Sequence, residues 1–94
     1  AVINIDAKIG AACIINTAAT VDHDCVLEDG VHISPGAHLA GVVQVGKATW
    51  LGIGSCVIQS VTIGQHVVLG AGAVAISDLP DGVTAKGIPA RFSL

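Results

Sequence analysis

The chain is poor in the large residues that usually fill a globular core. Its 94 residues include one Trp, one Phe, no Tyr and no Met, although 52% of them are apolar. The interior must therefore be filled by aliphatic and small side chains. This length suits one domain with a small core that is only modestly shielded from water.

Positive charge and long apolar runs are also scarce. Only four residues are Lys or Arg, and the net charge of −3 argues against nucleic acid or an anionic membrane as a partner. No apolar run approaches the roughly 20 residues that a membrane span needs. We see no secretory signal, which would be a basic start followed by an apolar core and a small-residue cleavage site. We expect no nucleic-acid partner and no membrane partner.

The cysteines form no paired framework. Cys13, Cys25 and Cys56 are odd in number, which favours a reducing compartment, and we predict a cytoplasmic location. The chain opens at Ala1 without an initiator Met, which suggests a fragment or a processed product.

A six-residue repeat runs through most of the chain. Every sixth residue from Ile3 to Leu69 is a branched aliphatic, over twelve consecutive positions. A period of six fits neither a helix nor a long alternating strand, but it fits short strands that turn after every hexad. The residue four places after each aliphatic is compact, as a tight corner requires. The repeated aliphatics are Ile3, Ile9, Ile15, Val21, Leu27, Ile33, Leu39, Val45, Leu51, Val57, Ile63 and Leu69.

Three hexads per turn would make a triangular coil in which residues eighteen apart stack. Twelve hexads then give about four coils, roughly 20 Å tall at a strand spacing of ~4.8 Å. The sequence therefore predicts an all-β fold, a parallel β-helix over residues 1–74. The three predicted internal ladders are Ile3–Val21–Leu39–Val57, Ile9–Leu27–Val45–Ile63 and Ile15–Ile33–Leu51–Leu69.

The repeat weakens after Leu69. Ala75 occupies the next aliphatic position, and Pro80 and Pro89 follow in a segment that ends in Gly-Ile-Pro-Ala-Arg, residues 87–91. Because the end of a solenoid must be closed, we predict that residues 75–94 form a C-terminal cap.

Apolar residues are also predicted on the outside of the prism. They sit at the last hexad position, beside the inward aliphatic, and a small core needs further burial to offset the entropy of ordering the chain. We therefore expect a homo-oligomer. The outward apolar residues are Ile14, Val26, Trp50, Val68 and Val74.

The polar chemistry gathers in residues 20–36. This stretch holds His23 and His32, two of the four histidines, together with four of the seven acids. The two histidines are nine residues apart, half of an eighteen-residue coil, so they should project from different sides of one prism. A site that used both would lie between two subunits.

The chain resembles a known superfamily in two places. The [Ile/Leu/Val]-Gly-x-x-small-x hexad over residues 3–74 and the Gly-x-Pro-Ala-basic ending are similar to the hexapeptide-repeat acyltransferases. That resemblance implies a left-handed β-helix, an exception to the right-handed crossover rule, and a trimer with sites between subunits.

Residues 15–41 resemble a narrower family of bacterial sugar acetyltransferases, which N-acetylate UDP-4-amino-sugars of the bacillosamine pathway or perosamine, or O-acetylate sialic acid. The resemblance implies acetyl transfer from acetyl-CoA to an amino or hydroxyl group of a small-molecule sugar acceptor, without a metal. The matching elements are Asn16-Thr17, the triplet His23-acid-Cys25, His32-x-Ser34-x-Gly36 and Ala40-Gly41.

The resemblance also implies individual roles. His23 matches a general base and Asp24 an acid that raises its proton affinity, while Asn16 matches a residue near the sugar acceptor. His32 matches a contact to the thioester end of acetyl-CoA. The residues that match the backbone surface along which the pantetheine arm of acetyl-CoA lies are Gly41, Ile53, Gly70, Ala71 and Gly72.

Simple chemistry agrees with these roles. A thioester is already activated, so transfer needs a base with a pKa near 7 and a well-placed acceptor, and a carboxylate near an imidazole strengthens the base. Neighbours on a strand point to opposite faces, however, so Asp24 can assist His23 only where the chain turns.

Other interpretations compete. Cys25 falls in the inward small-residue position, which indicates a buried structural thiol rather than a nucleophile, and His38 and His66 read as surface residues. Asp22, Glu28 and Asp29 read as a solvated edge.

A zinc enzyme like the γ-type carbonic anhydrases would need three histidines converging at about 2.0–2.1 Å from one metal. The chain could also be a non-catalytic trimerisation scaffold or fragment, since family members usually carry a preceding Rossmann-like domain that holds the nucleotide-sugar.

Overall fold

The hexads fold into a triangular prism of short parallel strands. The computed structural model describes residues 1–93, and each strand is two residues long. Hydrogen-bonded neighbours form three sheets, in the orders β1-β4-β7-β10-β13, β2-β5-β8-β11 and β3-β6-β9-β12-β14. The strands are β1 (Val2–Ile3), β2 (Lys8–Ile9), β3 (Ile14–Ile15), β4 (Thr20–Val21), β5 (Val26–Leu27), β6 (His32–Ile33), β7 (His38–Leu39), β8 (Gln44–Val45), β9 (Trp50–Leu51), β10 (Cys56–Val57), β11 (Thr62–Ile63), β12 (Val68–Leu69), β13 (Val74–Ala75) and β14 (Thr84–Ala85).

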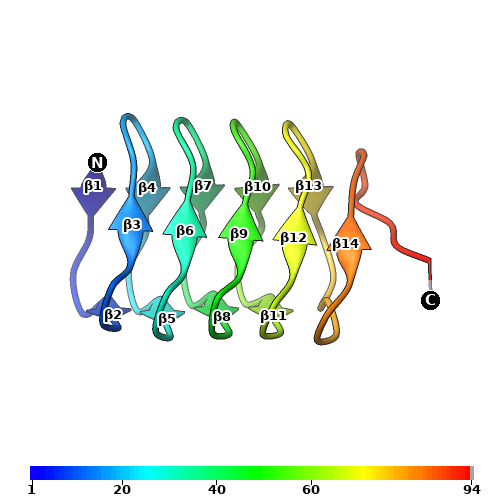
Figure 1. Cartoon of the computed structure of the whole chain (residues 1–94). Helices are drawn as coiled ribbons and strands as arrows, with labels where there is room; N and C mark the ends of the chain where they lie inside the picture. The colour runs from blue at the N-terminus through cyan, green and yellow to red at the C-terminus, as the bar shows by residue number, and fades with distance from the viewer. Residues whose placement is uncertain (94) are drawn as a thin grey trace.

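The coil is left-handed. In Figure 1 the chain runs upward through the near sheet, β3-β6-β9-β12-β14, and downward through the far sheet while it advances from left to right. The prediction of an all-β left-handed parallel β-helix is confirmed. We call β3-β6-β9-β12-β14 the near sheet, β1-β4-β7-β10-β13 the far sheet and β2-β5-β8-β11 the lower sheet.

The eighteen-residue register is also confirmed. All three predicted ladders occur as directly paired residues in neighbouring parallel strands. In the near sheet, Ile33, Leu51 and Leu69 stack in sequence and none of them is exposed. The one side chain per strand that points inward thus forms a continuous aliphatic core along the axis.

The helix has five turns rather than the four that the repeat predicts. Leu79 bridges Ile63 and Ala85 pairs with Leu69, each sixteen residues apart instead of eighteen. The corner after β13 is therefore two residues shorter than the corners before it, which shifts the repeat out of phase. Leu79 and Ala85 nevertheless point inward and are buried. The division into a β-helix of residues 1–74 and a cap of residues 75–94 stays a prediction.

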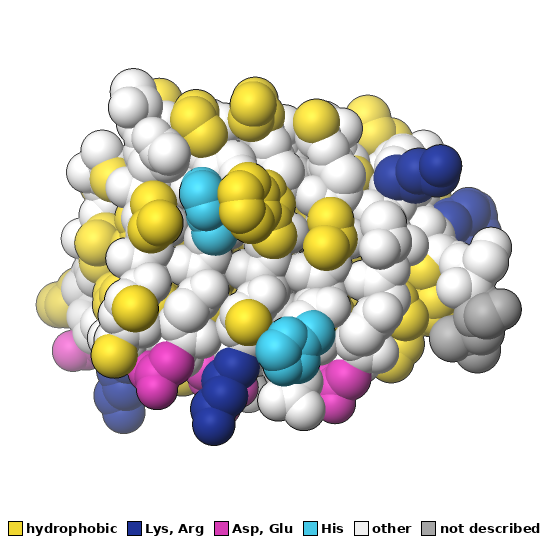
Figure 2. Space-filling model, viewed as in Figure 1, with side chains coloured by type: hydrophobic (Ala, Val, Ile, Leu, Met, Phe, Trp, Pro, Cys, Tyr) yellow, Lys and Arg dark blue, Asp and Glu magenta, His cyan; other side chains and the backbone are white. Residues whose placement is uncertain are grey.

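The three faces differ in chemistry. On the near sheet Ile14, Trp50 and Val68 are exposed, and Figure 2 shows hydrophobic side chains and a histidine over the middle of this face. Charged side chains gather instead along its lower edge (Figure 2). The other two residues predicted to point outward, Val26 and Val74, are half-buried. No helix long and apolar enough to span a membrane occurs among residues 1–93.

Shortening one core residue should weaken the whole prism. Leu51→Ala removes a fully buried side chain between Ile33 and Leu69, so we expect the free energy of unfolding to fall by about 2–5 kcal/mol. Ile76→Ala, at an aliphatic that is 51% exposed, is the matched control and should cost much less. Urea denaturation monitored by circular dichroism measures both. Equal losses would contradict the stacked-core description.

Candidate active site

The corner after β4 pairs a histidine with an acid. The ring Nδ1 of His23 lies 3.1 Å from Oδ2 of Asp24, and both side chains are about half exposed. Asp24 has a positive φ of 58°, and its N–H donates to the carbonyl of Ile5 in the turn below. The chain therefore turns where the predicted His23–Asp24 contact requires it, and adjacent residues can point to the same side.

A second acid fixes the backbone of that histidine. The N–H of His23 donates to Oδ1 of Asp22 at 2.7 Å, and Nδ2 of Asn4 donates to the same oxygen at 3.0 Å. These hydrogen bonds, chiefly the one from His23, hold the pKa of Asp22 below its ordinary value of 3.8. From the sequence alone, Asp22 reads as part of a solvated edge, whereas in the structure it binds both Asn4 and His23. The eighteen-residue spacing between Asn4 and Asp22 was the signal that could have revealed the contact.

The imidazole of His23 packs against a glycine of the turn above. A Cβ added to Gly41 would lie 2.6 Å from Cε1 of His23, closer than real side-chain contacts allow. Gly41 stands one turn above His23, and the N–H of the next residue, Val42, donates to the carbonyl of His23 at 2.9 Å. The resemblance implies that Gly41 belongs to the cofactor wall. In the structure Gly41 lies against the ring and leaves room for it.

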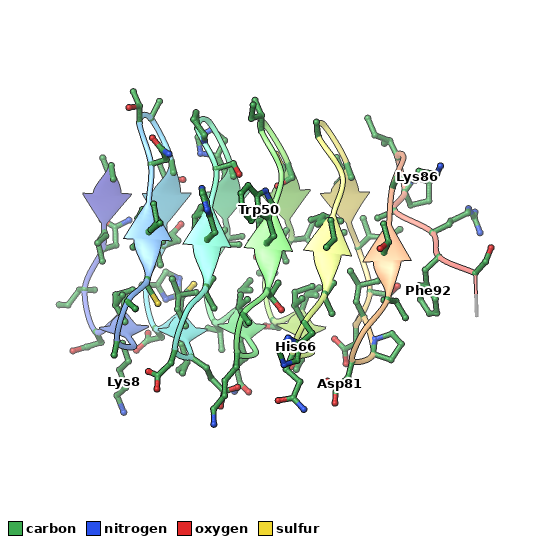
Figure 3. The ribbon with its side chains drawn as sticks, in the orientation of Figure 1. Lys8, Trp50, His66, Asp81, Lys86 and Phe92 are labelled. Atoms are coloured by element: carbon green, nitrogen blue, oxygen red, sulfur yellow. The ribbon has the colours of Figure 1, made fainter. Side chains whose placement is uncertain are left out.

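His32 belongs to a different face. It lies on β6 in the near sheet, and its ring stacks on Trp50 with a centroid separation of 4.0 Å and an interplanar angle of 29°. Trp50 projects from the middle of the near sheet in Figure 3. Both rings line a groove of about 370 Å³. The groove also contains Ile53, Gly70 and Ala71, so four predicted cofactor-binding residues share one surface.

The remaining predicted residues lie at the corner between the near and far sheets. Asn16 follows β3, and its Oδ1 accepts a hydrogen bond from the N–H of Thr17 at 2.8 Å. Gly72 is three turns further along, has a φ of 68° and faces open space. β4 separates Asn16 from His23, so the two residues lie at opposite edges of the far sheet.

One chain therefore holds the predicted site in two halves. The His23–Asp24 pair lies at the corner between the far and lower sheets, whereas the His32 groove lies on the near sheet. The prediction that His23 and His32 project from different sides is confirmed.

The other reactive side chains support the structural interpretations. Cys25 is fully buried and its Sγ donates to the carbonyl of Ala40 at 3.1 Å, while burial raises the pKa of this thiol. Nδ1 of His38 lies 2.7 Å from Oγ1 of Thr20 on the far sheet, away from His32. Within residues 1–93 no three His, Cys, Asp or Glu side chains come together around a possible metal site.

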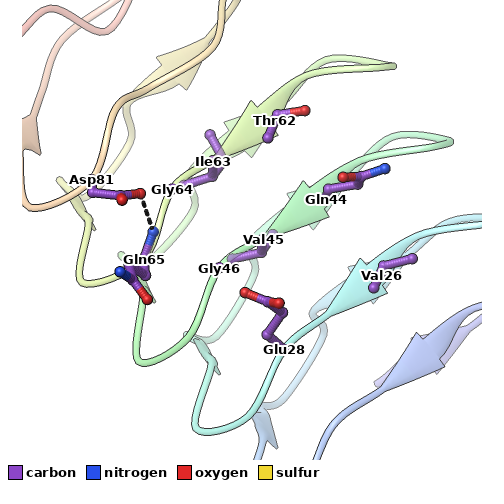
Figure 4. A pocket seen from close by; sticks show the side chains of 10 residues that line it. All are labelled: Val26, Glu28, Gln44, Val45, Gly46, Thr62, Ile63, Gly64, Gln65 and Asp81. Atoms are coloured by element: carbon purple, nitrogen blue, oxygen red, sulfur yellow. Dashed lines mark hydrogen bonds between the residues drawn. The ribbon is translucent and has the colours of Figure 1, made fainter.

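Another depression lies on the lower sheet and shares no residue with the predicted site. It has a volume of about 330 Å³ and is lined by side chains of β5, β8 and β11 (Figure 4). At its end the N–H of Gln65 donates to Asp81 at 2.9 Å. Its polar rim includes Glu28 and Gln44.

Comparison with known proteins gives consistent relatives, although no family model matches the chain. It is 32% identical to the mitochondrial serine acetyltransferase 3 of Arabidopsis thaliana over 92% of the chain and 25% of that protein. A mutant of GDP-perosamine N-acetyltransferase from Caulobacter crescentus, solved with CoA and GDP-perosamine, superposes with a TM-score of 0.97. It shares 49% identity over 99% of this chain and 45% of its own.

The acetyltransferase domain of PglB from Neisseria gonorrhoeae, in complex with acetyl coenzyme A, has a TM-score of 0.87 and 42% identity over 98% of this chain. The chain spans about half of the length of the two bacterial structures and about a quarter of the plant enzyme. Fold, repeat and relatives together place it in the hexapeptide-repeat acyltransferases. Within them it is similar to the sugar acetyltransferases that residues 15–41 indicate.

Adding one methyl group at Gly41, against the His23 imidazole, should move the ring. Gly41→Ala places a Cβ against the His23 ring, so we expect the ring to leave Asp24 while the fold persists. The ¹H and ¹³C NMR signals of the His23 imidazole should shift. Gly54→Ala is the control for added bulk, because nothing lies within 4 Å of its Cβ position, although its φ of 68° adds backbone strain. An unchanged His23 spectrum in Gly41→Ala would contradict the contact.

Asp22 should make stability depend on acid pH. A carboxyl whose pKa is lowered by folding stabilises the fold above its unfolded pKa near 3.8, and this stabilisation is lost as pH falls through the lower folded value. Between pH 5 and pH 2, Asp22→Asn should therefore lose less stability than the unmodified chain. Thermal unfolding across this range measures the difference, and parallel curves would contradict it.

Proposed function

We propose that this chain is the catalytic β-helix of an acetyl-CoA-dependent sugar acetyltransferase. The observation that carries the proposal is the His23–Asp24 pair, held at a corner by the neighbouring Asp22 and by Gly41 one turn above. Solved relatives with CoA or acetyl coenzyme A bound support the identity of the acyl donor.

His23 acts as the general base. Nδ1 faces Asp24, so an Nδ1–H donated to that carboxylate leaves Nε2 to accept a proton. The acceptor amine attacks the acetyl carbonyl carbon and loses a proton to Nε2, and the C–S bond breaks to release CoA thiolate. The protonated imidazole returns the proton to the thiolate. The carboxylate of Asp24 stabilises the imidazolium in between.

Two adjoining subunits complete each site. The His23 corner and the His32 groove lie on different sides of one prism, so a homotrimer would bring the corner of one subunit to the groove of the next. The exposed Ile14, Trp50 and Val68 give the near sheet the apolar character of an interface. In that arrangement His32 contacts the thioester, and pantetheine runs along Ile53, Ala71 and the neighbouring glycines.

The acceptor is a nucleotide-linked 4-amino-sugar. A GDP-perosamine N-acetyltransferase, solved with CoA and GDP-perosamine, is the relative that supports this choice. Asn16 contributes to acceptor binding by resemblance. Reduced cysteines at positions 13, 25 and 56 fit a cytoplasmic enzyme, where nucleotide-sugars are made.

Removing the base should nearly abolish transfer. We expect His23→Ala to lower the turnover of acetyl-CoA by at least about 100-fold, the usual contribution of a general base. The assay measures CoA release with a panel of nucleotide 4-amino-sugars, using the full-length protein. His66→Asn is the matched control, because His66 lies at a distant exposed corner with a φ of 54° that Asn tolerates.

Four results bear on the proposal. Full activity in His23→Ala would remove this residue from the mechanism. Equal losses in His23→Ala and His66→Asn would indicate a general structural effect. Absence of turnover in the unmodified protein with every acceptor would favour the non-catalytic scaffold, and stoichiometric zinc in the purified protein would favour the carbonic-anhydrase-like alternative.

A further inference from the structure

The proposed function uses Trp50 only as part of an apolar face, yet its indole contacts a site residue. Trp50 on β9 pairs directly with His32 on β6, so the two side chains project from the same face of the near sheet. Their ring centroids lie 4.0 Å apart and the ring planes meet at 29°, which is a stacked contact. Figure 2 shows a histidine beside hydrophobic side chains over the middle of this face.

The imidazole of His32 is held differently from two other imidazoles of the chain. Nδ1 of His23 lies 3.1 Å from the carboxylate of Asp24. Nδ1 of His38 lies 2.7 Å from Oγ1 of Thr20. Within residues 1–93 neither ring nitrogen of His32 has a hydrogen-bond partner. Packing against a neighbouring side chain must therefore fix the direction of this ring, and both of its nitrogens stay available to a ligand.

The neighbours of His32 leave the indole as the group that fixes the ring plane. All other residues that line the groove are uncharged, so no charge within it orients the imidazole. In the outward row of the near sheet, Ile14 stands on one side of His32 and Trp50 on the other. The second side-chain torsion of His is only weakly fixed by its own preference. A flat surface restrains that torsion, and Ile14 presents none.

The same row argues against Trp50 as an open platform for a flat ligand. One face of the indole packs against His32. The side chain that follows Trp50 in the row is Val68, its direct partner on β12. The indole is thus flanked along the row by residues of its own chain, on the side of the site and on the side of the C-terminus.

We infer that Trp50 is a positioning residue for acyl transfer, an inference that rests on the proposed function. It holds the imidazole of His32 in the orientation in which a ring N–H points at the acetyl carbonyl oxygen of the bound thioester. That oxygen gains negative charge when the acceptor amine attacks the carbonyl carbon. A donor that is already aimed at the oxygen stabilises this charge without reorienting. Trp50 acts through His32 and moves no proton itself.

The test is a double-mutant cycle between Trp50 and His32, assayed by CoA release in the full-length protein. Trp50→Val should lower kcat about tenfold, less than the roughly 100-fold cost of removing a well-aimed donor. KM for acetyl-CoA should change less than about twofold, because the affected contact forms in the transition state. In the His32→Ala background the same substitution should cost less than about twofold, since the ring that Trp50 holds is gone. Trp50→Phe keeps a flat ring and should retain at least about half of kcat.

Three controls keep the cycle interpretable. Val suits this row, since Val68 and Thr84 occupy the next two turns, and Trp50→Thr is a second variant without a ring. Ile76→Ala removes an exposed aliphatic outside the groove and should leave kcat and KM unchanged. Size-exclusion chromatography with light scattering checks that each variant keeps the oligomeric state of the unmodified protein.

The stack also has a spectroscopic signature that needs no turnover. The ring current of the indole moves the Cε1–H and Cδ2–H NMR signals of His32 upfield. Trp50→Val should return these signals downfield, and Trp50→Phe should do so only in part. Trp50 is the only Trp of the chain, so a change of indole fluorescence in His32→Ala reports the same contact from the other side.

Equal losses of kcat from Trp50→Val in the two backgrounds would overturn the inference, because Trp50 would then act without His32. A loss confined to KM would overturn it too and would assign Trp50 to cofactor binding. So would a Trp50→Phe variant as slow as Trp50→Val. Each of these results leaves acyl transfer itself intact. Absence of turnover in the unmodified protein with every acceptor would instead overturn the proposed function, and this inference with it.

Discussion

The hydrogen-bonded register between successive turns is the constraint on which the rest of the structure depends. Strands of two residues cannot be stable alone, and each is held by parallel neighbours in the turns before and after it. That pairing aligns identical positions of each turn along the axis. Aliphatics stack on aliphatics inside, corners stack on corners, and a side chain placed on one turn has its surroundings set by residues one turn away.

The candidate site illustrates this dependence. The His23 ring is positioned by Asp24 beside it, but Gly41 above it and Asn4 below it act from other turns, the latter through Asp22. The turn above also carries strain. Val42 is β-branched yet has a φ of 60°, and its N–H binds the carbonyl of His23. Strained corners of this kind are typical of places where a side chain must be held in one direction.

Much of the fold could be predicted because the hexad repeat is periodic and each ladder residue is aliphatic. The fifth turn could not, because a corner two residues shorter than its predecessors hid Leu79 and Ala85 from a search at fixed spacing. The placement of His23 and His32 on different sides followed from their spacing alone. The support of His23 by Asp22 and Gly41 did not, since a hydrogen bond and a missing Cβ are visible only once the turns are superposed.

The regular spacing of the turns also limits the length of the molecules that can bind along the groove. Two residues can be lost at a corner, as after β13, but the strands of successive turns must still pair in register to keep their aliphatics in the interior. The length of the near-sheet groove can therefore change only by whole turns, in increments of about 4.8 Å. In a scaffold of this kind, the distance between the two ends of the groove takes only discrete values, one for each number of turns. Variants that gain or lose one turn would select carriers of a different length rather than bind the same carrier slightly less well.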